Sequence, residues 1–197
     1  RILNLCLQTK NLPQSEKIGI ITGLPKSEGL VTDTSNIRPI TVGQAMSRLL
    51  HKVLAGRLST YLVRHNMIDR AQAAFIPGGD IHEPISAATA CYRDRISQKK
   101  GCYAVYYDIS KAYDTIRWES IREALQAIGM EQAFIDLVMN SLEGSTTAMR
   151  TNVPGRTTRS VTLHKSIKQG CPLAPLLFII VMDELHRELK RARIGYQ

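Results

Sequence analysis

The longest amphipathic stretch of the chain covers residues 43–65. Its apolar side chains recur at intervals of three and four positions, which places them on one face of an α-helix. They are Met46, Leu49, Leu50, Val53, Leu54, Leu58 and Leu62, with the cations Arg48, Lys52, Arg57 and Arg64 between them. The pattern predicts a helix that buries its apolar face, and we interpret the cations mainly as its solvated face.

Helix signals also occur in several other parts of the chain. Predicted helices cover residues 83–100, 117–128, 131–142 and 172 to about 191, and the chain begins in what reads as a helix already under way. Pro84 stands in the first turn of the first of these, and Gly101 follows its end. Gly129 has the role of a C-terminal cap between the second and third. Pro172 and Pro175 fit the first turn of the last helix, where a proline costs no amide donor.

Two pairs of predicted strands stand apart from the helices. Residues 17–24 and 37–42 form one pair, linked by the polar loop 27–36. Residues 145–151 and 159–165 flank a Val-Pro-Gly-Arg turn, which is typical of a hairpin.

The apolar and aromatic run 101–107 predicts one more strand. It contains no breaker after Gly101, so we expect it to be buried and to deliver Asp108 at its C-terminal end. Helices and short strands therefore alternate along the chain, and we expect an α+β fold.

Charge is distributed unevenly along the 197 residues, which carry a formal net charge of +9. Residues 1–100 hold 14 Lys and Arg against 7 Asp and Glu, whereas residues 101–197 hold 12 against 10. A basic excess of this kind suits a polyanionic partner. A hydrophobic content of 44% is enough for one sizeable core, or for two small subdomains that share one.

The cysteines and the apolar runs exclude several classes of protein. Cys6, Cys91, Cys102 and Cys171 show neither metal-ligand spacing nor a disulfide framework, which fits a reducing compartment. No run reaches the roughly 20 apolar residues of a membrane span, and no secretory signal is present. We therefore expect no membrane partner and an intracellular location, in the nucleus or cytoplasm if the protein is eukaryotic.

Directly after the predicted strand 101–107, an aspartate is followed five positions later by an aromatic residue. The segment reads Asp108-Ile109-Ser110-Lys111-Ala112-Tyr113-Asp114. A carboxylate at a strand end is open to ions and ligands, although Asp also caps ordinary turns. The pattern resembles the first catalytic motif of reverse transcriptases, particularly those of non-LTR retrotransposons and group II introns.

A second block resembles the Arg-Gln-Gly-x-Pro-x-Ser-Pro motif of the same family. It reads Lys168-Gln169-Gly170-Cys171-Pro172-Leu173-Ala174-Pro175, with Lys168 where Arg is usual and Ala174 where Ser is usual. Because glycine has no side chain, the Gln-Gly turn allows backbone to approach a ligand closely. The resemblance implies that Gln169 and Gly170 pack against the new base pair.

The N-terminal half contains two more blocks in the family's order. Lys26 and the Arg38 of Arg-Pro-Ile resemble the fingers residues that reach toward the incoming nucleotide, although a solvated surface cation is the commoner fate of such residues. Arginine grips phosphate bidentately and lysine acts as a point charge. Gln72 and Phe75 resemble the Gln-x-x-Phe segment that supports the template, and the same residues also read as a Gly-rich loop after a helix.

The resemblance implies a right-hand polymerase, with fingers and part of the palm in residues 1–100 and a partial palm in residues 101–197. The implied activity is RNA-directed DNA polymerisation, in which two Mg²⁺ ions, or Mn²⁺, help add dNTPs to a primer 3′-hydroxyl. Asp108 and the Ile109 carbonyl would bind metal, with Asp108 as the catalytic residue. Tyr113 would exclude a 2′-hydroxyl, unless it is simply a core aromatic. The implied partners are an RNA template, a DNA primer and dNTPs, in an oligomeric state that the sequence does not define.

The family places a Tyr- or Phe-Ala-Asp-Asp turn downstream, and no Asp-Asp pair occurs in these 197 residues. We therefore expect a fragment that is inactive alone and lacks the thumb. Three alternatives stay open: a non-catalytic nucleic-acid-binding remnant, a group II intron maturase, and another right-hand polymerase such as an RNA-templated RNA polymerase. Tyr113 argues against the last, since that enzyme must admit ribose.

Overall fold

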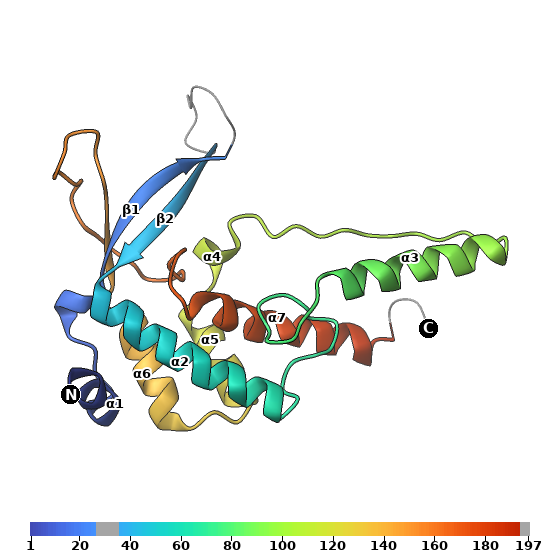
Figure 1. The fold of residues 1–197 in the computed structure, drawn as a ribbon, viewed down its shortest axis with the longest axis horizontal. Coiled ribbons are helices and arrows are strands. Elements are labelled where there is room, and N and C mark those ends of the chain that lie inside the picture. Colours follow the sequence, from blue (N-terminus) through green and yellow to red (C-terminus); the bar gives the residue numbers. More distant parts are fainter. Residues whose placement is uncertain (27–35, 194–197) are drawn as a thin grey trace.

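The computed structural model describes residues 1–26 and 36–193, which combine helices with one sheet. The helices are α1 (Ile2–Thr9), α2 (Ala45–Arg64), α3 (His82–Ser97), α4 (Ala112–Thr115), α5 (Trp118–Ala127), α6 (Gln132–Leu142) and α7 (Ala174–Arg191), with a short 3₁₀ turn, η1 (Gln14–Lys17). The strands are β1 (Ile18–Pro25), β2 (Ile37–Gly43), β3 (Thr146–Met149) and β4 (Val161–Thr162). The predicted mixture of helix and strand is confirmed, and Figure 1 shows the sheet projecting from one end of a helical body.

In the described residues the sheet order is β2-β1-β3-β4. β1 and β2 pair antiparallel from Gly19 opposite Gly43 to Pro25 opposite Ile37, which confirms the predicted first pair. β3 lies parallel to β1, and β4 pairs antiparallel with β3 over two residues. The predicted second hairpin therefore forms, with shorter strands than expected. The predicted linking loop 27–36 lies almost wholly outside the described residues.

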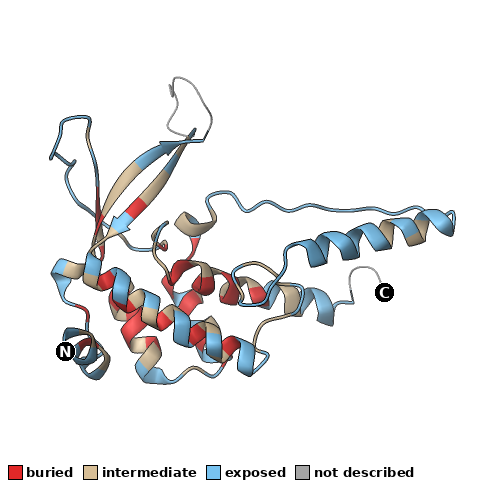
Figure 2. Ribbon diagram, in the orientation of Figure 1, coloured by how far each residue is buried: buried red, intermediate tan, exposed pale blue. Residues whose placement is uncertain are grey.

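The helical body encloses the core, which Figure 2 shows as buried segments of α2, α5, α6 and α7. Leu50, Leu54, Leu58 and Leu62 of α2 are at most 1% exposed. Their four-residue spacing forms one stripe along the helix, which is the stripe that the sequence pattern predicts. Ile121 and Leu125 of α5 and the apolar side of α7 complete the same cluster. The predicted helices are confirmed, with ends displaced by one to several residues.

The prediction of a buried strand at residues 101–107 is wrong. Residues 101–109 form neither helix nor strand, and Tyr103, Tyr106 and Tyr107 are 98%, 86% and 88% exposed. The segment runs back along α3, a helix with no buried residues, and the two form an arm beside the body (Figure 1). A strand needs a partner for its backbone N–H and C=O groups. No strand in the described part of the chain pairs with this segment.

Candidate nucleotide-binding site

A pocket of about 520 Å³ lies between the β1–β2 hairpin, the turn that leads into α4, and the loop before α7. It is lined by Lys26, Ile37, Arg38, Pro39, Lys111, Ala112, Asp114 and Gln169. The first and last of these residues, Lys26 and Gln169, are more than 140 positions apart in the sequence, and the fold brings them to one place. Three of the residues predicted to bind nucleotide, Lys26, Arg38 and Gln169, are among them.

The hairpin fixes the two cations that it contributes. Arg38 lies opposite Leu24 in the antiparallel ladder, and Lys26 directly follows the end of β1. The Lys26 amide donates to the Asn36 carbonyl at 2.8 Å, so the pairing continues one step beyond the strands. Both cations are exposed, and neither forms an ion pair within residues 1–26 and 36–193.

A second wall of the pocket contains Lys111, from the turn before α4, and Asp114, from α4 itself. Lys111 has φ 50° and ψ 44°, the left-handed conformation that few residues other than Gly, Asn and Asp adopt readily. Its carbonyl accepts from the amides of Asp114 at 2.9 Å and Thr115 at 3.1 Å, which closes the turn. The sequence motif contains Lys111, but the family resemblance implies no role for this residue.

The third wall is the Gln169–Gly170 turn, which is tied to β2. The Thr41 amide donates to the Gln169 carbonyl at 2.7 Å. Gly170 has φ +109°, and a Cβ built on it would lie 2.7 Å from the Thr41 carbonyl oxygen. Glycine is therefore required at this position because β2 approaches the turn closely. This requirement holds whether or not a ligand also approaches the turn.

The motifs and this pocket agree with the comparisons to known proteins. A family model described as reverse transcriptase (RNA-dependent DNA polymerase) matches residues 24–196. The chain belongs to the reverse transcriptase family. The resemblance inferred from the sequence motifs is confirmed.

Relatives of this reverse transcriptase chain include proteins of retrotransposable elements. It is 32% identical over 189 residues to the retrovirus-related Pol polyprotein from type-2 retrotransposable element R2DM of Drosophila melanogaster, covering 96% of this chain and 17% of the relative. It is 37% identical over 166 residues to the Pol polyprotein from type-1 retrotransposable element R2 of Popillia japonica, covering 83% of this chain and 22% of the relative. The chain thus spans about a fifth of the length of these relatives.

The reverse transcriptase motif residue Asp108 lies outside the pocket lining. Asp108 and Ile109 belong to the exposed segment that leads to the Lys111 turn. Among residues 1–26 and 36–193, no three His, Cys, Asp or Glu side chains gather closely enough to hold an ion. An exposed carboxylate and a backbone carbonyl are oxygen ligands of the kind Mg²⁺ accepts, but they do not make a two-ion site. The described residues therefore do not fit the complete metal centre, and we derive no step through it.

Tyr113, the predicted sugar-contacting residue, is half-buried against the core. Its ring lies edge-on to Phe178 with the ring centroids 5.4 Å apart, and its carbonyl accepts from the Ile167 amide at 2.9 Å. Burial, and to a smaller extent the nearby Cys171, raises the pKa of the Tyr113 hydroxyl. Tyr113 does not line the pocket, whereas its neighbours Ala112 and Asp114 do. Its sugar-selecting role stays a prediction.

Gln72 and Phe75, the predicted template residues, lie between α2 and α3 and away from the pocket lining. The Gln72 side-chain amide donates to the Ala74 carbonyl at 3.1 Å. Phe75 is 62% exposed at φ 61° and lines a separate groove with Pro172 and Pro175 at the start of α7. An exposed aromatic beside a groove can stack on a base, although nothing in the geometry identifies the ligand.

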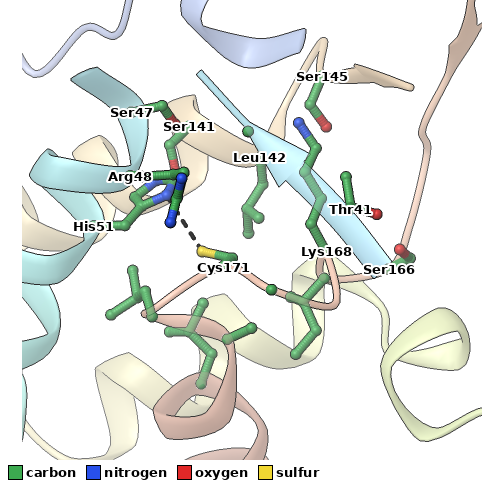
Figure 3. Close-up of a pocket in the computed structure, with 16 residues that line it drawn as sticks. Thr41, Ser47, Arg48, His51, Ser141, Leu142, Ser145, Ser166, Lys168 and Cys171 are labelled. Atoms are coloured by element: carbon green, nitrogen blue, oxygen red, sulfur yellow. Dashed lines mark hydrogen bonds between the residues drawn. The ribbon is translucent and has the colours of Figure 1, made fainter. Parts of the chain in front are cut away.

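A small cavity, for which the sequence carries no signal, lies behind the Gln169–Gly170 turn (Figure 3). Its volume is about 30 Å³, enough for about one or two water molecules. The Lys168 ammonium donates to the Lys17 carbonyl at 2.5 Å, and burial lowers the pKa of Lys168 to about 8. Lys168 thus ties the turn to the base of β1, as Thr41 ties it to β2.

His51 and Cys171 form the other side of this cavity. The Cys171 Sγ and His51 Nδ1 atoms are 3.3 Å apart, and the buried His51 Nε2 has no hydrogen-bond partner in the described part of the chain. Burial, with a smaller contribution from Lys168, lowers the pKa of His51 to about 4. Burial also raises the pKa of the Cys171 thiol. A neutral imidazole beside an un-ionised thiol is a structural pair, and it offers no activated nucleophile.

An ion-pair network centred on the buried Asp183 holds the loop after α2 against α7. Asp183 is 2% exposed and accepts from the Asp69 amide and from the Arg187 guanidinium, each at 2.7 Å. Arg187 also donates to the Met67 carbonyl at 2.8 Å, and Lys190 pairs with Asp69 at 2.5 Å. The network fixes the start of the loop that carries Gln72 and Phe75. Only an acidic residue on the otherwise apolar face of the predicted helix could have signalled it.

Proposed function

We propose that this chain is the nucleotide-binding part of a retrotransposon RNA-directed DNA polymerase, which adds dNTPs to a primer on an RNA template. The observation that carries the proposal is the pocket in which Lys26, Arg38 and Gln169 meet the turn that follows Asp108. A nucleoside triphosphate carries several negative charges, and cations on preformed turns lower the cost of gathering that charge. Membership of the reverse transcriptase family supports the same function.

In this proposal Lys26 and Arg38 neutralise the triphosphate, while Gln169 and Gly170 face the new base pair. Asp108 and the Ile109 carbonyl would supply part of the oxygen ligands for divalent metal. Tyr113 restricts the sugar, and Gln72 and Phe75 support the template. We further propose that residues 1–100 are fingers with part of the palm and that residues 101–197 are palm.

No helix in residues 1–26 or 36–193 combines the length and apolar character that a membrane crossing requires. The partners we propose, from the family match, are an RNA template, a DNA primer and dNTPs.

The test has one binding arm and one catalytic arm. In the binding arm, Lys26→Ala and Arg38→Ala should each weaken dATP affinity of this chain about tenfold, since each removes a charge-assisted phosphate contact. Arg57→Ala, at an exposed cation on α2, is the matched control. In the catalytic arm, Asp108→Ala in a polymerase that contains this chain should abolish primer extension. Full extension by that variant would refute the role of Asp108.

A non-catalytic nucleic-acid-binding role is the second candidate, because the described residues form no group able to hold a metal ion. The net charge of +9 would then serve binding alone. Each neutralised phosphate contributes about −0.7 to −0.9 to the slope of log affinity against log salt. Binding with a steep slope by the chain, together with no extension by the longer polymerase, would favour this candidate over the first.

A further inference from the structure

Lys111 is the one pocket-lining cation that the sequence motifs left without a function. It comes from the turn before α4, whereas Lys26 and Arg38 come from the β1–β2 hairpin. A ligand in the pocket would therefore meet cations from two separate elements.

The charge of the described pocket lining favours an anion with more than one negative charge. Among the described lining residues, the cations Lys26, Arg38 and Lys111 accompany a single carboxylate, Asp114. Within the described ranges, none of these four side chains forms an ion pair. The described lining thus carries a formal charge of +2, which suits a polyphosphate better than a neutral or singly charged ligand.

The turn depends on the backbone of Lys111 and not on its charged side chain. Its φ of 50° is more favourable for Gly or Asn than for Lys, so folding alone gives no reason for a lysine at this position. The turn is closed by the carbonyl of Lys111, not by its side chain. A neutral Asn should therefore keep the turn while removing the ammonium group.

We propose that Lys111 is a third triphosphate-binding cation, which binds the nucleotide from the turn before α4 while Lys26 and Arg38 bind it from the β1–β2 hairpin. The inference rests on the proposed function, since it assumes that the pocket receives a nucleotide. Lys111 contacts the ligand through charge, so its contribution falls on the phosphates and not on the base or sugar.

The experiment measures binding of dATP, inorganic tripolyphosphate and deoxyadenosine to the whole chain by titration calorimetry. Lys111→Asn should weaken the binding of dATP and of tripolyphosphate about tenfold, because one charge-assisted contact is lost. The affinity for deoxyadenosine should be unchanged. Lys111→Arg should retain most of the affinity. Lys100→Asn, at an exposed cation on the arm, is the control and should change nothing. The melting temperature of Lys111→Asn should equal or exceed that of the parent chain.

The outcomes separate this inference from the function on which it rests. If Lys26→Ala and Arg38→Ala weaken triphosphate binding while Lys111→Asn does not, the Lys111 inference is overturned and the nucleotide pocket stands. If none of the three variants weakens binding, both are overturned. If Lys111→Asn weakens deoxyadenosine binding as much as triphosphate binding, or if Lys111→Arg fails to retain triphosphate affinity, Lys111 shapes the pocket and does not bind phosphate.

Discussion

Substitution of Gly170 measures how much the packing of the Gln169–Gly170 turn against β2 contributes to stability. At its φ of +109° a non-glycine residue is strained, at a cost of about 1–3 kcal/mol. An added Cβ would also lie 2.7 Å from the Thr41 carbonyl oxygen, and backbone cannot swing aside as a flexible side chain can. Relief of this contact requires the turn to move, which breaks the bond from the Thr41 amide to Gln169, worth about 0.5–1.5 kcal/mol.

Gly170→Ala should therefore lower the free energy of unfolding by about 2–4 kcal/mol, the combined cost of strain and the lost bond. Gly155→Ala is the matched control, because Gly155 also has positive φ, at +75°, but a Cβ there meets nothing within 4 Å. The control should lose only about 1 kcal/mol, from the left-handed backbone alone. Urea unfolding measures both losses, and hydrogen exchange of the Thr41 amide reports the displaced turn directly.

Equal losses in the two variants would show that backbone conformation alone decides the cost, and the close approach of Thr41 would then have no energetic meaning. Unchanged exchange at Thr41 in Gly170→Ala would show that the turn has not moved. Because Gln169 lines the proposed nucleotide pocket, a displaced turn should also weaken dATP binding, while Gly155→Ala should not.

Three further outcomes follow from buried groups. The pKa of His51 is lowered from 6.5 to about 4, so the free energy of unfolding should fall by up to about 3 kcal/mol as pH drops from 6.5 to 4, because the unfolded chain gains the proton first. His51→Gln should remove this pH dependence in urea unfolding, and an unchanged curve would contradict the assignment. Asp183→Ala should cost about 3 kcal/mol, because it leaves the Asp69 amide unpaired and Arg187 without its carboxylate, whereas Glu184→Ala, at an exposed neighbour, should cost under about 0.5 kcal/mol. Tyr113→Ala should raise ribonucleotide use by the longer polymerase while Tyr113→Phe does not; a large fall in melting temperature with an unchanged ratio of dNTP to NTP use would mean that Tyr113 is only a core aromatic.

The sequence could predict the helices and the first strand pair because their signals are local. The leucines of α2 at positions 50, 54, 58 and 62 form a stripe that can be found in a window of 20 residues, and all four are buried. The Gly129 cap and the proline at the start of α7 likewise mark their helix ends without any knowledge of the rest of the fold.

The assembly of the pocket depends on contacts that leave no local signal. Thr41 bonds Gln169, and the Lys168 ammonium bonds the Lys17 carbonyl across 151 positions. The His51–Cys171 pair is 120 positions apart in the sequence, and Cys171 stands at the variable position of its motif. Family resemblance predicted that Lys26, Arg38 and Gln169 would serve one ligand. The structure adds the surroundings: the cavity behind the turn, the Asp183 network and the position of Lys111.

The segment 101–109 shows why a strand pattern is a weaker predictor than a helix pattern. A helix satisfies its backbone groups within the same segment, whereas a strand must find another strand, and its sequence does not specify which one. With no partner in the described residues, the apolar run stays exposed, and the predicted position of Asp108 at a buried strand end is lost.

Covalent geometry still limits where Asp108 can lie, because three residues span at most roughly 11 Å. Asp108 precedes Lys111 by three residues, and Lys111 is fixed in the pocket wall by its own turn. Any strand that pairs with the segment would therefore reorient the Asp108 carboxylate at the edge of the nucleotide pocket without carrying it to another part of the fold.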